Sequence, residues 1–258
     1  MSDFDRNLAA RGAGFGRAVA VDAGLRAYML RVYNYMAIGL AITGLTAFGA
    51  YTLSVTTDPA LASATLPNGL MLTSLGYALF ISPLKWVVFL APLGLVFLLS
   101  ARINRMSTAG AQMAFWVFAA VLGISLGSIF MVYTYTSIAR VFFITAASFG
   151  ALSLYGYTTQ RDLSPIGSFL IMGLFGLILA SLVNIFLASP AMQFVISVVG
   201  VLVFAGLTAW DTQRIKEMYD VHDDGTMAGR KAIMGALSLY LDFINMFTFL
   251  LQLFGDRR

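Results

Sequence analysis

Two acidic side chains inside apolar stretches are the residues best suited to chemistry in this sequence. Asp211 and Asp242 each interrupt a long run of apolar residues. A charged side chain at the centre of a membrane helix costs about 2.5–3.5 kcal/mol. Two carboxylates that face each other in an apolar medium should not both ionise, and they titrate as a unit. Such a pair could hold a shared proton, or it could bind Ca²⁺, which prefers oxygen ligands.

The spacing of the two acids predicts that they meet. Each lies about fifteen residues from the centre of the polar segment between the two runs, near Thr226–Met227. In an antiparallel helix pair these positions reach a similar depth, because each helix rises about 1.5 Å per residue. Ser238, Asp242 and Asn245 share one helix face, so Ser238 and Asn245 are supporting polar residues of the pair. The plainer alternative is that the acids only hold two helices together through hydrogen bonds.

Other common kinds of site are missing from the sequence. It has no cysteine and one histidine, His222, which argues against disulfides, thiolate or zinc sites and a Ser-His-Asp triad. The segment Asp220–Gly225 resembles the start of a calcium loop. However, its third position is His222 and its twelfth is Lys231, where a bidentate glutamate is required. We therefore expect Asp220–Gly225 to be a solvated turn. The sequence also contains no glycine-rich phosphate loop, and we expect no enzyme activity.

The elements that must position the acids are membrane helices. Of 258 residues, 59% are hydrophobic and 11% are charged, against about 45–50% and about 25% in soluble domains. A spanning helix needs about 20 mostly apolar residues. The sequence therefore predicts an all-α, polytopic membrane protein, a bundle of seven transmembrane helices. The seven runs are Tyr28–Val55, Lys85–Ala101, Gln112–Tyr133, Arg140–Tyr157, Ile166–Ala188, Ala191–Gln213 and Ala232–Phe254.

Two further segments complete the domain organisation. Leu66–Ser82 is less apolar, contains Pro67 and is followed by Pro83. Because proline and glycine punctuate both of its ends, we expect an interfacial or re-entrant helix and no eighth span. Residues 1–27 mix glycine, arginine and aspartate and are predicted to form a flexible N-terminal tail. Residues 28–258 are then the transmembrane domain.

The basic residues predict the orientation, because lysine and arginine concentrate on the cytoplasmic side. With the N-terminus inside, 12 of the 16 basic residues lie inside. A six-span layout, in which the last run dips in and returns, would also bring Arg257 and Arg258 inside and is the second choice. We interpret the net charge of +4 as orientation charge beside anionic lipid, with no nucleic-acid partner. The inside set is Arg6, Arg11, Arg17, Arg26, Arg31, Arg102, Arg105, Arg161, Arg214, Lys216, Arg230 and Lys231.

Arg102 and Arg105 follow the second run, on the predicted inner side. Either arginine could pair with a buried aspartate and compensate for its burial. The alternative is that both only anchor the helix end at the membrane surface.

The stretches around the two acids resemble the Bax inhibitor family, also called the transmembrane Bax inhibitor motif family. The matching residues are Leu207–Lys216, with Trp210-Asp211-Thr212-Gln213, and Ala236–Phe247, with Leu241-Asp242-Phe243. The second stretch is highly specific to that family and the first is moderately so. Ser100–Ser107 adds to the resemblance, which extends from about Tyr28 to the last residue.

The resemblance implies a pH-sensitive calcium leak in a seven-helix bundle. The acid pair of the family falls on Asp211 and Asp242, which would bind the ion and sense pH. The family also has a basic gating latch near the inner end of the second helix. By position relative to Gly123-Ile124, Arg105 fits that role best and Arg102 second. No cofactor is implied other than bound Ca²⁺.

The resemblance leaves other functions open. Members bind other membrane proteins, including a membrane protease in bacteria, so a regulator that conducts nothing is the main alternative. An intramembrane aspartyl protease also needs two membrane aspartates, but the Gly-x-Gly-Asp setting of those enzymes does not occur at either acid. The lack of cysteines and of long soluble segments favours a bacterial inner-membrane member with its N-terminus in the cytoplasm.

Overall fold

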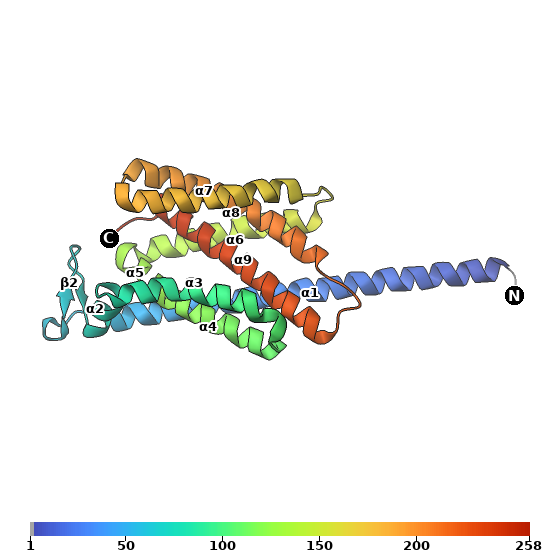
Figure 1. Ribbon diagram of the computed structural model, residues 1–258, viewed down its shortest axis with the longest axis horizontal. Coiled ribbons are helices and arrows are strands. Elements are labelled where there is room, and N and C mark those ends of the chain that lie inside the picture. Colours follow the sequence, from blue (N-terminus) through green and yellow to red (C-terminus); the bar gives the residue numbers. More distant parts are fainter. Residues whose placement is uncertain (1–2) are drawn as a thin grey trace.

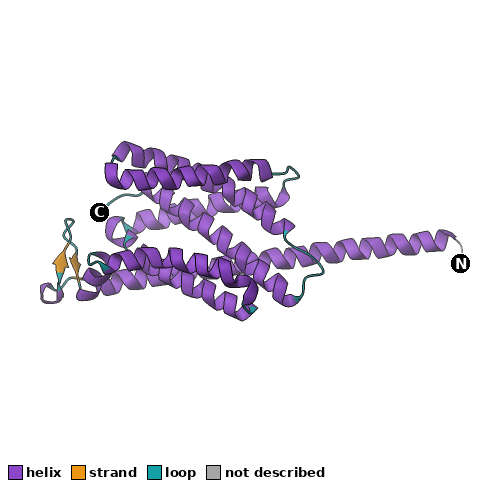
Figure 2. Cartoon of the chain, viewed as in Figure 1, coloured by secondary structure: helices purple, strands orange, loops and turns teal. Residues whose placement is uncertain are grey.

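A bundle of long helices accounts for most of the molecule. The computed structural model describes residues 3–258, with side chains for residues 23–103 and 105–258. Figures 1 and 2 show the helices side by side, with a small sheet at one end of the bundle. The helices are α1 (Asp3–Ser54), α2 (Ser74–Phe80), α3 (Leu84–Arg102), α4 (Thr108–Leu126), α5 (Ile129–Val132), α6 (Tyr135–Thr158), α7 (Ser164–Leu187), α8 (Pro190–Glu217) and α9 (Gly225–Phe254).

Within the described residues, seven helical segments are long and apolar enough to cross a membrane. They are Ala23–Ser54, Leu84–Arg102, Thr108–Val132, Tyr135–Thr158, Ser164–Leu187, Pro190–Glu217 and Gly225–Phe254. Each contains most of one predicted run. The prediction of an all-α, seven-helix membrane bundle is therefore confirmed, and the chain is an integral multi-pass membrane protein.

The two ends of the bundle carry different connections. One end, here called the inner end, holds the α8–α9 connection, whose Tyr219 ring lies 5.7 Å from that of Tyr28 on α1. At the other end, the outer end, Arg258 N–H donates to Val132 O at 2.9 Å and Thr134 N–H donates to Asp256 O at 3.0 Å. Helix α9 thus runs the full length of the bundle (Figure 1). This path supports seven spans over six, while the side of the membrane that each end faces stays a prediction.

The weakly apolar segment Leu66–Ser82 lies at the outer end and does not cross the bundle. Only Ser74–Phe80 of it is helical, so the expected helix is wrong over its first half. That half joins a small antiparallel sheet of β1 (Val55–Thr56), β3 (Met71–Leu72) and β2 (Ala64–Thr65), in that order. The turn before β3 uses Gly69 at φ +83°, a conformation that glycine adopts without strain.

Helix α1 passes through the predicted boundary at residue 27 without a break. It begins at Asp3 and continues for 52 residues to Ser54. Figure 1 shows its first part projecting beyond the inner end of the bundle. The division between tail and transmembrane domain is thus not marked by a change of secondary structure, and flexibility of the tail stays a prediction.

Helix α9 forms the centre of the bundle. Of its most apolar stretch, 67% is buried, compared with 11% for the corresponding stretches of α3 and α7. It packs against α8, α1, α6 and α4. Close approach elsewhere depends on small residues, because a Cβ on Gly156 of α6 would meet the backbone of Ala209 on α8. Asp242, near the middle of α9, is accordingly buried inside the protein.

Candidate functional site

The structure brings the two predicted acids together between α8 and α9. The side chains of Asp211 and Asp242 interact directly. Both residues are buried, with exposed fractions of 7% and 5%. Asp211 and Asp242, which are equally far from the helix connection in the sequence, thus lie at a similar depth in the bundle.

Each carboxyl group has one oxygen atom without a hydrogen-bond partner. These buried atoms are Asp211 Oδ1 and Asp242 Oδ2. An unsatisfied buried polar atom costs about 1–3 kcal/mol, and more when it is charged. A shared proton, a water molecule or a cation would remove that cost. The arrangement is therefore suited to bind a small positive species, and the ion itself stays a prediction.

Arg214 is the basic residue at the acid pair. Its Nη2 atom lies 3.0 Å from Asp211 Oδ1, one helical turn along α8. The contact is a charge pairing without hydrogen-bond alignment, since Asp211 Oδ1 has no hydrogen-bond partner. The guanidinium also lies 4.8 Å from the centre of the Trp210 ring. With its side chain 45% exposed and that of Asp211 10% exposed, Arg214 connects the buried pair to the surface.

The expected latch residues lie elsewhere in this conformation. Arg102 ends α3 and lines a cavity with Leu99 of α3 and Met113 of α4. Arg105 ends the short 3₁₀ helix η2 (Ile103–Arg105) and is exposed. In this structure neither Arg105 nor Arg102 forms an ion pair with Asp211 or Asp242, and their role as a gating latch stays a prediction. They form none because α3 packs mainly on α4, while the ion pair to Asp211 comes from α8 itself.

The two supporting polar residues have different surroundings. Ser238 shares a cavity of about 320 Å³ with Arg214. Asn245 donates to Leu241 O of its own helix at 2.8 Å and lines a separate cavity with Leu174 of α7. Ser238 therefore lies at the candidate site in this structure. The contacts of Asn245 are with its own helix and with a different cavity.

The cavity beside Ser238 lies between the acid pair and the inner end. Helix α8 runs towards that end after Asp211, and α9 runs away from it before Asp242. All residues that line the cavity fall on these inward segments, namely Arg214, Ile215, Met218, Met234, Gly235 and Ser238. An ion from the inner side would thus meet Arg214 before the acids.

Hydroxyl groups close to the acids in the sequence bond to residues of other helices. The Tyr33 hydroxyl is 2.5 Å from Ser153 Oγ, which is 2.9 Å from Oγ1 of Thr212, the neighbour of Asp211. Two residues before Asp242, the Tyr240 hydroxyl is 2.5 Å from Thr43 Oγ1. Sequence reasoning missed these contacts, although hydroxyl residues inside apolar runs were the available signal. None of these hydroxyl groups supplies a hydrogen bond to Asp211 Oδ1 or Asp242 Oδ2.

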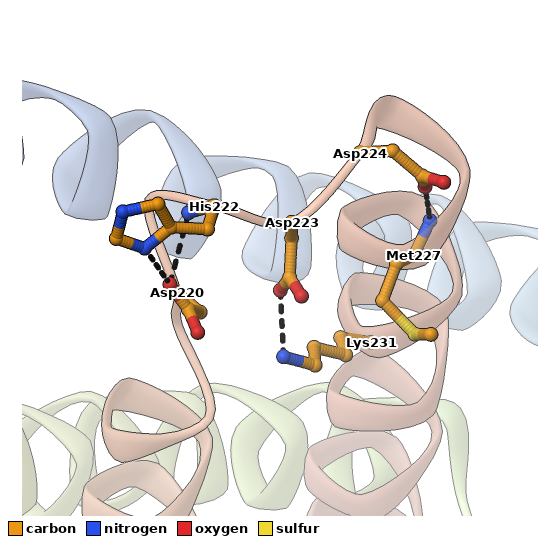
Figure 3. A network of polar contacts seen from close by, with 6 residues as sticks. All are labelled: Asp220, His222, Asp223, Asp224, Met227 and Lys231. Carbon is orange, nitrogen blue, oxygen red and sulfur yellow. Dashed lines mark hydrogen bonds and ion pairs between the residues drawn. The ribbon is translucent and has the colours of Figure 1, made fainter.

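The loop that resembled a calcium loop uses its carboxylates within the protein (Figure 3). Asp220 Oδ1 accepts from the His222 N–H at 2.9 Å and lies 3.0 Å from the ring Nδ1. The backbone bond and then the ring contact lower the pKa of Asp220. Asp223 Oδ2 lies 2.6 Å from Lys231 Nζ. The Asp220 carboxyl group therefore stays ionised at pH values below those at which an ordinary aspartate becomes protonated. It cannot account for a response near neutral pH.

The third aspartate of this loop begins helix α9. Asp224 Oδ1 accepts from the Met227 N–H at 2.6 Å, as an N-cap residue does. Among the described residues, no group of three or more His, Cys, Asp or Glu side chains is placed to hold a metal ion. A cation at Asp211 and Asp242 would thus need backbone or water oxygens as further ligands.

Comparisons with known proteins cover the whole bundle. A family model described as "Inhibitor of apoptosis-promoting Bax1" matches residues 25–258. The inner membrane protein YbhL of Escherichia coli (strain K12) is 44% identical over 238 residues, which is 92% of this chain and 94% of YbhL. A protein of Caulobacter vibrioides is 43% identical over 264 aligned residues, with both chains covered completely. A protein of Rickettsia prowazekii is 46% identical over 238 residues, 92% of each chain.

Proposed function

The chain belongs to the Bax inhibitor family of membrane proteins, and we propose that it forms a Ca²⁺-permeable cation leak controlled by protons at Asp211 and Asp242. The observation that carries the proposal is the buried acid pair, in which each carboxyl group has an oxygen atom without a hydrogen-bond partner and Arg214 is ion-paired with the one on Asp211. Oxygen atoms of this kind suit both a proton and Ca²⁺, so the two ions compete for one place. The proposal includes no enzyme activity.

The state of the pair sets the state of the leak. With one shared proton, the two carboxyl groups attract each other and hold α8 against α9, which is the closed arrangement. Loss of that proton leaves two negative charges in an apolar setting, where they repel each other strongly. The helices then separate at this depth, and a cation can replace the proton. The leak should therefore increase as pH rises.

Arg214 is the gate on the inner side in this proposal. It stands between the cavity of about 320 Å³ and the acids, with Nη2 at 3.0 Å from Asp211 Oδ1. Its positive charge repels an approaching cation and compensates the charge of Asp211 while the leak is closed. A gating latch at Arg105 or Arg102 stays a separate prediction of the family resemblance.

The bacterial inner membrane is the proposed location, with the inner end in the cytoplasm. The relative YbhL is named an inner membrane protein. Most lysine and arginine residues fall at the inner end, as expected for the cytoplasmic side. A membrane protease or another membrane protein as partner stays a prediction of the family resemblance.

The deciding experiment measures Ca²⁺ entry into liposomes that contain the purified full chain and a calcium dye, between about pH 6 and pH 8. Entry should be faster at the higher pH. Asp242→Asn removes one of the two charges, so its entry rate should no longer depend on pH. Asp211→Asn should behave in the same way, because the two acids titrate together.

His222→Gln is the matched control for this experiment. His222 is the one histidine of the sequence and the side-chain type that changes charge near neutral pH. It lies in the α8–α9 connection with Asp220, so its replacement should leave the pH response unchanged. A retained response in Asp242→Asn would refute the assigned sensor. Folded protein without flux above empty liposomes would instead favour the non-conducting regulator.

A further inference from the structure

A second cavity lies at the inner half of the bundle, between α1 and α6. It has a volume of about 560 Å³, which is within the about 300–1,000 Å³ of typical ligand sites. None of its lining residues belongs to the cavity beside Arg214 and Ser238. The leak proposal therefore makes no use of it.

The walls of this cavity are mostly apolar, and the hydroxyl groups of Tyr33 and Ser153 that line it bond to each other. Leu30 of α1 and Leu154 of α6 form its edges, with exposed fractions of 53% and 63%. Met29 and Phe149 are buried and form its deeper surface. Because these edges belong to membrane-spanning segments, the opening faces lipid tails. An acyl chain from the bilayer is the apolar group that can enter from this side.

Positive and hydrogen-bonding groups stand at the inner rim of the same cavity. Arg26 lines it from α1 and is exposed. On the α6 side, Tyr157 lines the cavity, and its carbonyl oxygen accepts from Lys216 Nζ at 2.9 Å. The same Nζ lies 5.5 Å from the centre of the Tyr157 ring. Two cations therefore flank the level at which a lipid headgroup would lie.

We propose that this cavity binds one anionic phospholipid from the leaflet at the inner end. An acyl chain would lie between Leu30 and Leu154, and the headgroup phosphate would lie between Arg26 and Lys216. Basic pockets between membrane helices bind anionic headgroups by this combination of charge and apolar contact. A free phosphate would gain nothing from the apolar walls, so the lipid is the occupant that the whole cavity fits.

The proposal can be tested by native mass spectrometry of the full chain in mild detergent. The protein is titrated with dioleoyl phosphatidylglycerol, which is anionic, and separately with dioleoyl phosphatidylethanolamine, which has no net charge. Wild-type protein should retain one phosphatidylglycerol with an affinity about fivefold above that for phosphatidylethanolamine. Arg26→Gln should lose most of this preference, because it removes one cation from the rim.

A second variant tests the acyl site. A Cβ on Gly150, which lines the cavity, meets no atom within 4 Å, so Gly150→Leu fills the space without a backbone clash. It should reduce the retention of both lipids. Gly176→Leu on α7 is the matched control, because a Cβ there also meets nothing within 4 Å. Arg31→Gln on α1 is the control for charge, since Arg31 does not line the cavity.

The outcomes separate clearly once unfolding temperatures show that each variant is folded. Loss of preference in Arg26→Gln, together with loss of retention in Gly150→Leu, supports the lipid site. Equal affinity of wild type for both lipids overturns it. Gly150→Leu that retains lipid as well as Gly176→Leu, or Arg26→Gln that matches Arg31→Gln, overturns it too. None of these readouts depends on ion flux.

Discussion

Arg214 joins a solvent-accessible position to a buried carboxyl group. Its own side chain is 45% exposed, and that of Asp211 is 10% exposed. A half-exposed partner is screened by water, so the pairing contributes less than a fully buried one would. Such a contact can be broken at small cost, which is what a gate requires.

Arg214→Gln should therefore raise Ca²⁺ entry at a given pH by about twofold to tenfold, because it removes the positive charge that repels a cation approaching the acids from the inner cavity. Entry rates in the liposome assay provide the measurement. Arg161→Gln, which removes a charge at the same end without contact to the acids, should match wild type. Equal rates in both variants would show that Arg214 is not the gate.

Single residues also show where sequence reasoning succeeds and where it stops. Asp211 and Asp242 could be predicted as site residues because a carboxylate inside a membrane helix is energetically costly in any fold, and such residues are therefore functional candidates. The charge pattern predicts only an orientation role for Arg214, although the sequence shows its spacing of three from Asp211. The contact between Thr43 and Tyr240 joins residues 197 apart in the sequence, and no local pattern gives that pairing.

Helices α6 and α8 approach each other at a glycine. A Cβ on Gly156 would meet the carbonyl oxygen, the carbonyl carbon and the Cα of Ala209. Backbone atoms cannot move aside as a flexible side chain can, so the two helices would have to separate. The same helix α6 carries Gly150, where a Cβ meets nothing within 4 Å.

Gly156→Ala should therefore destabilise the protein by about 1–3 kcal/mol, as expected for overpacking. Gly150→Ala should be neutral or slightly stabilising, because alanine favours a helix over glycine by about 0.5–1 kcal/mol. Thermal unfolding in detergent compares the two variants directly. Equal unfolding temperatures would mean that α6 and α8 adjust freely at this crossing.

The sequence predicts the spanning helices correctly, but it does not predict the structure of the segment at the outer end. Long apolar runs predict spanning helices because lipid leaves the backbone little choice. At the outer end, water can satisfy the backbone, so Leu66–Ser82 divides between strand, turn and the short helix α2. The predicted tail boundary at residue 27 marks a change of composition, and α1 continues through it.

Orientation is a property of the whole bundle. The inner end carries the α8–α9 connection with Val221, and the outer end carries Leu61. Both residues are well exposed, at 50% and 63%. Since the sequence has no cysteine, a single introduced cysteine gives an unambiguous label.

In intact cells whose outer membrane is permeable to the reagent, a membrane-impermeant thiol reagent should label Leu61→Cys. It should label Val221→Cys only after the inner membrane is opened. This result follows from the excess of basic residues at the inner end, which favours the cytoplasm. The reverse pattern of labelling would invert the proposed orientation and with it the side on which Arg214 meets the ion.

The central position of α9 bears on how the protein is made. This helix follows the other six spans in the sequence, yet it is the one most deeply enclosed by them. A ribosome therefore delivers α1, α4, α6 and α8 to the membrane before their common packing partner exists. Until α9 inserts, Asp211 lacks its acidic neighbour Asp242. Assembly of the acid pair is consequently a late event in biogenesis, and an unfinished chain cannot form it.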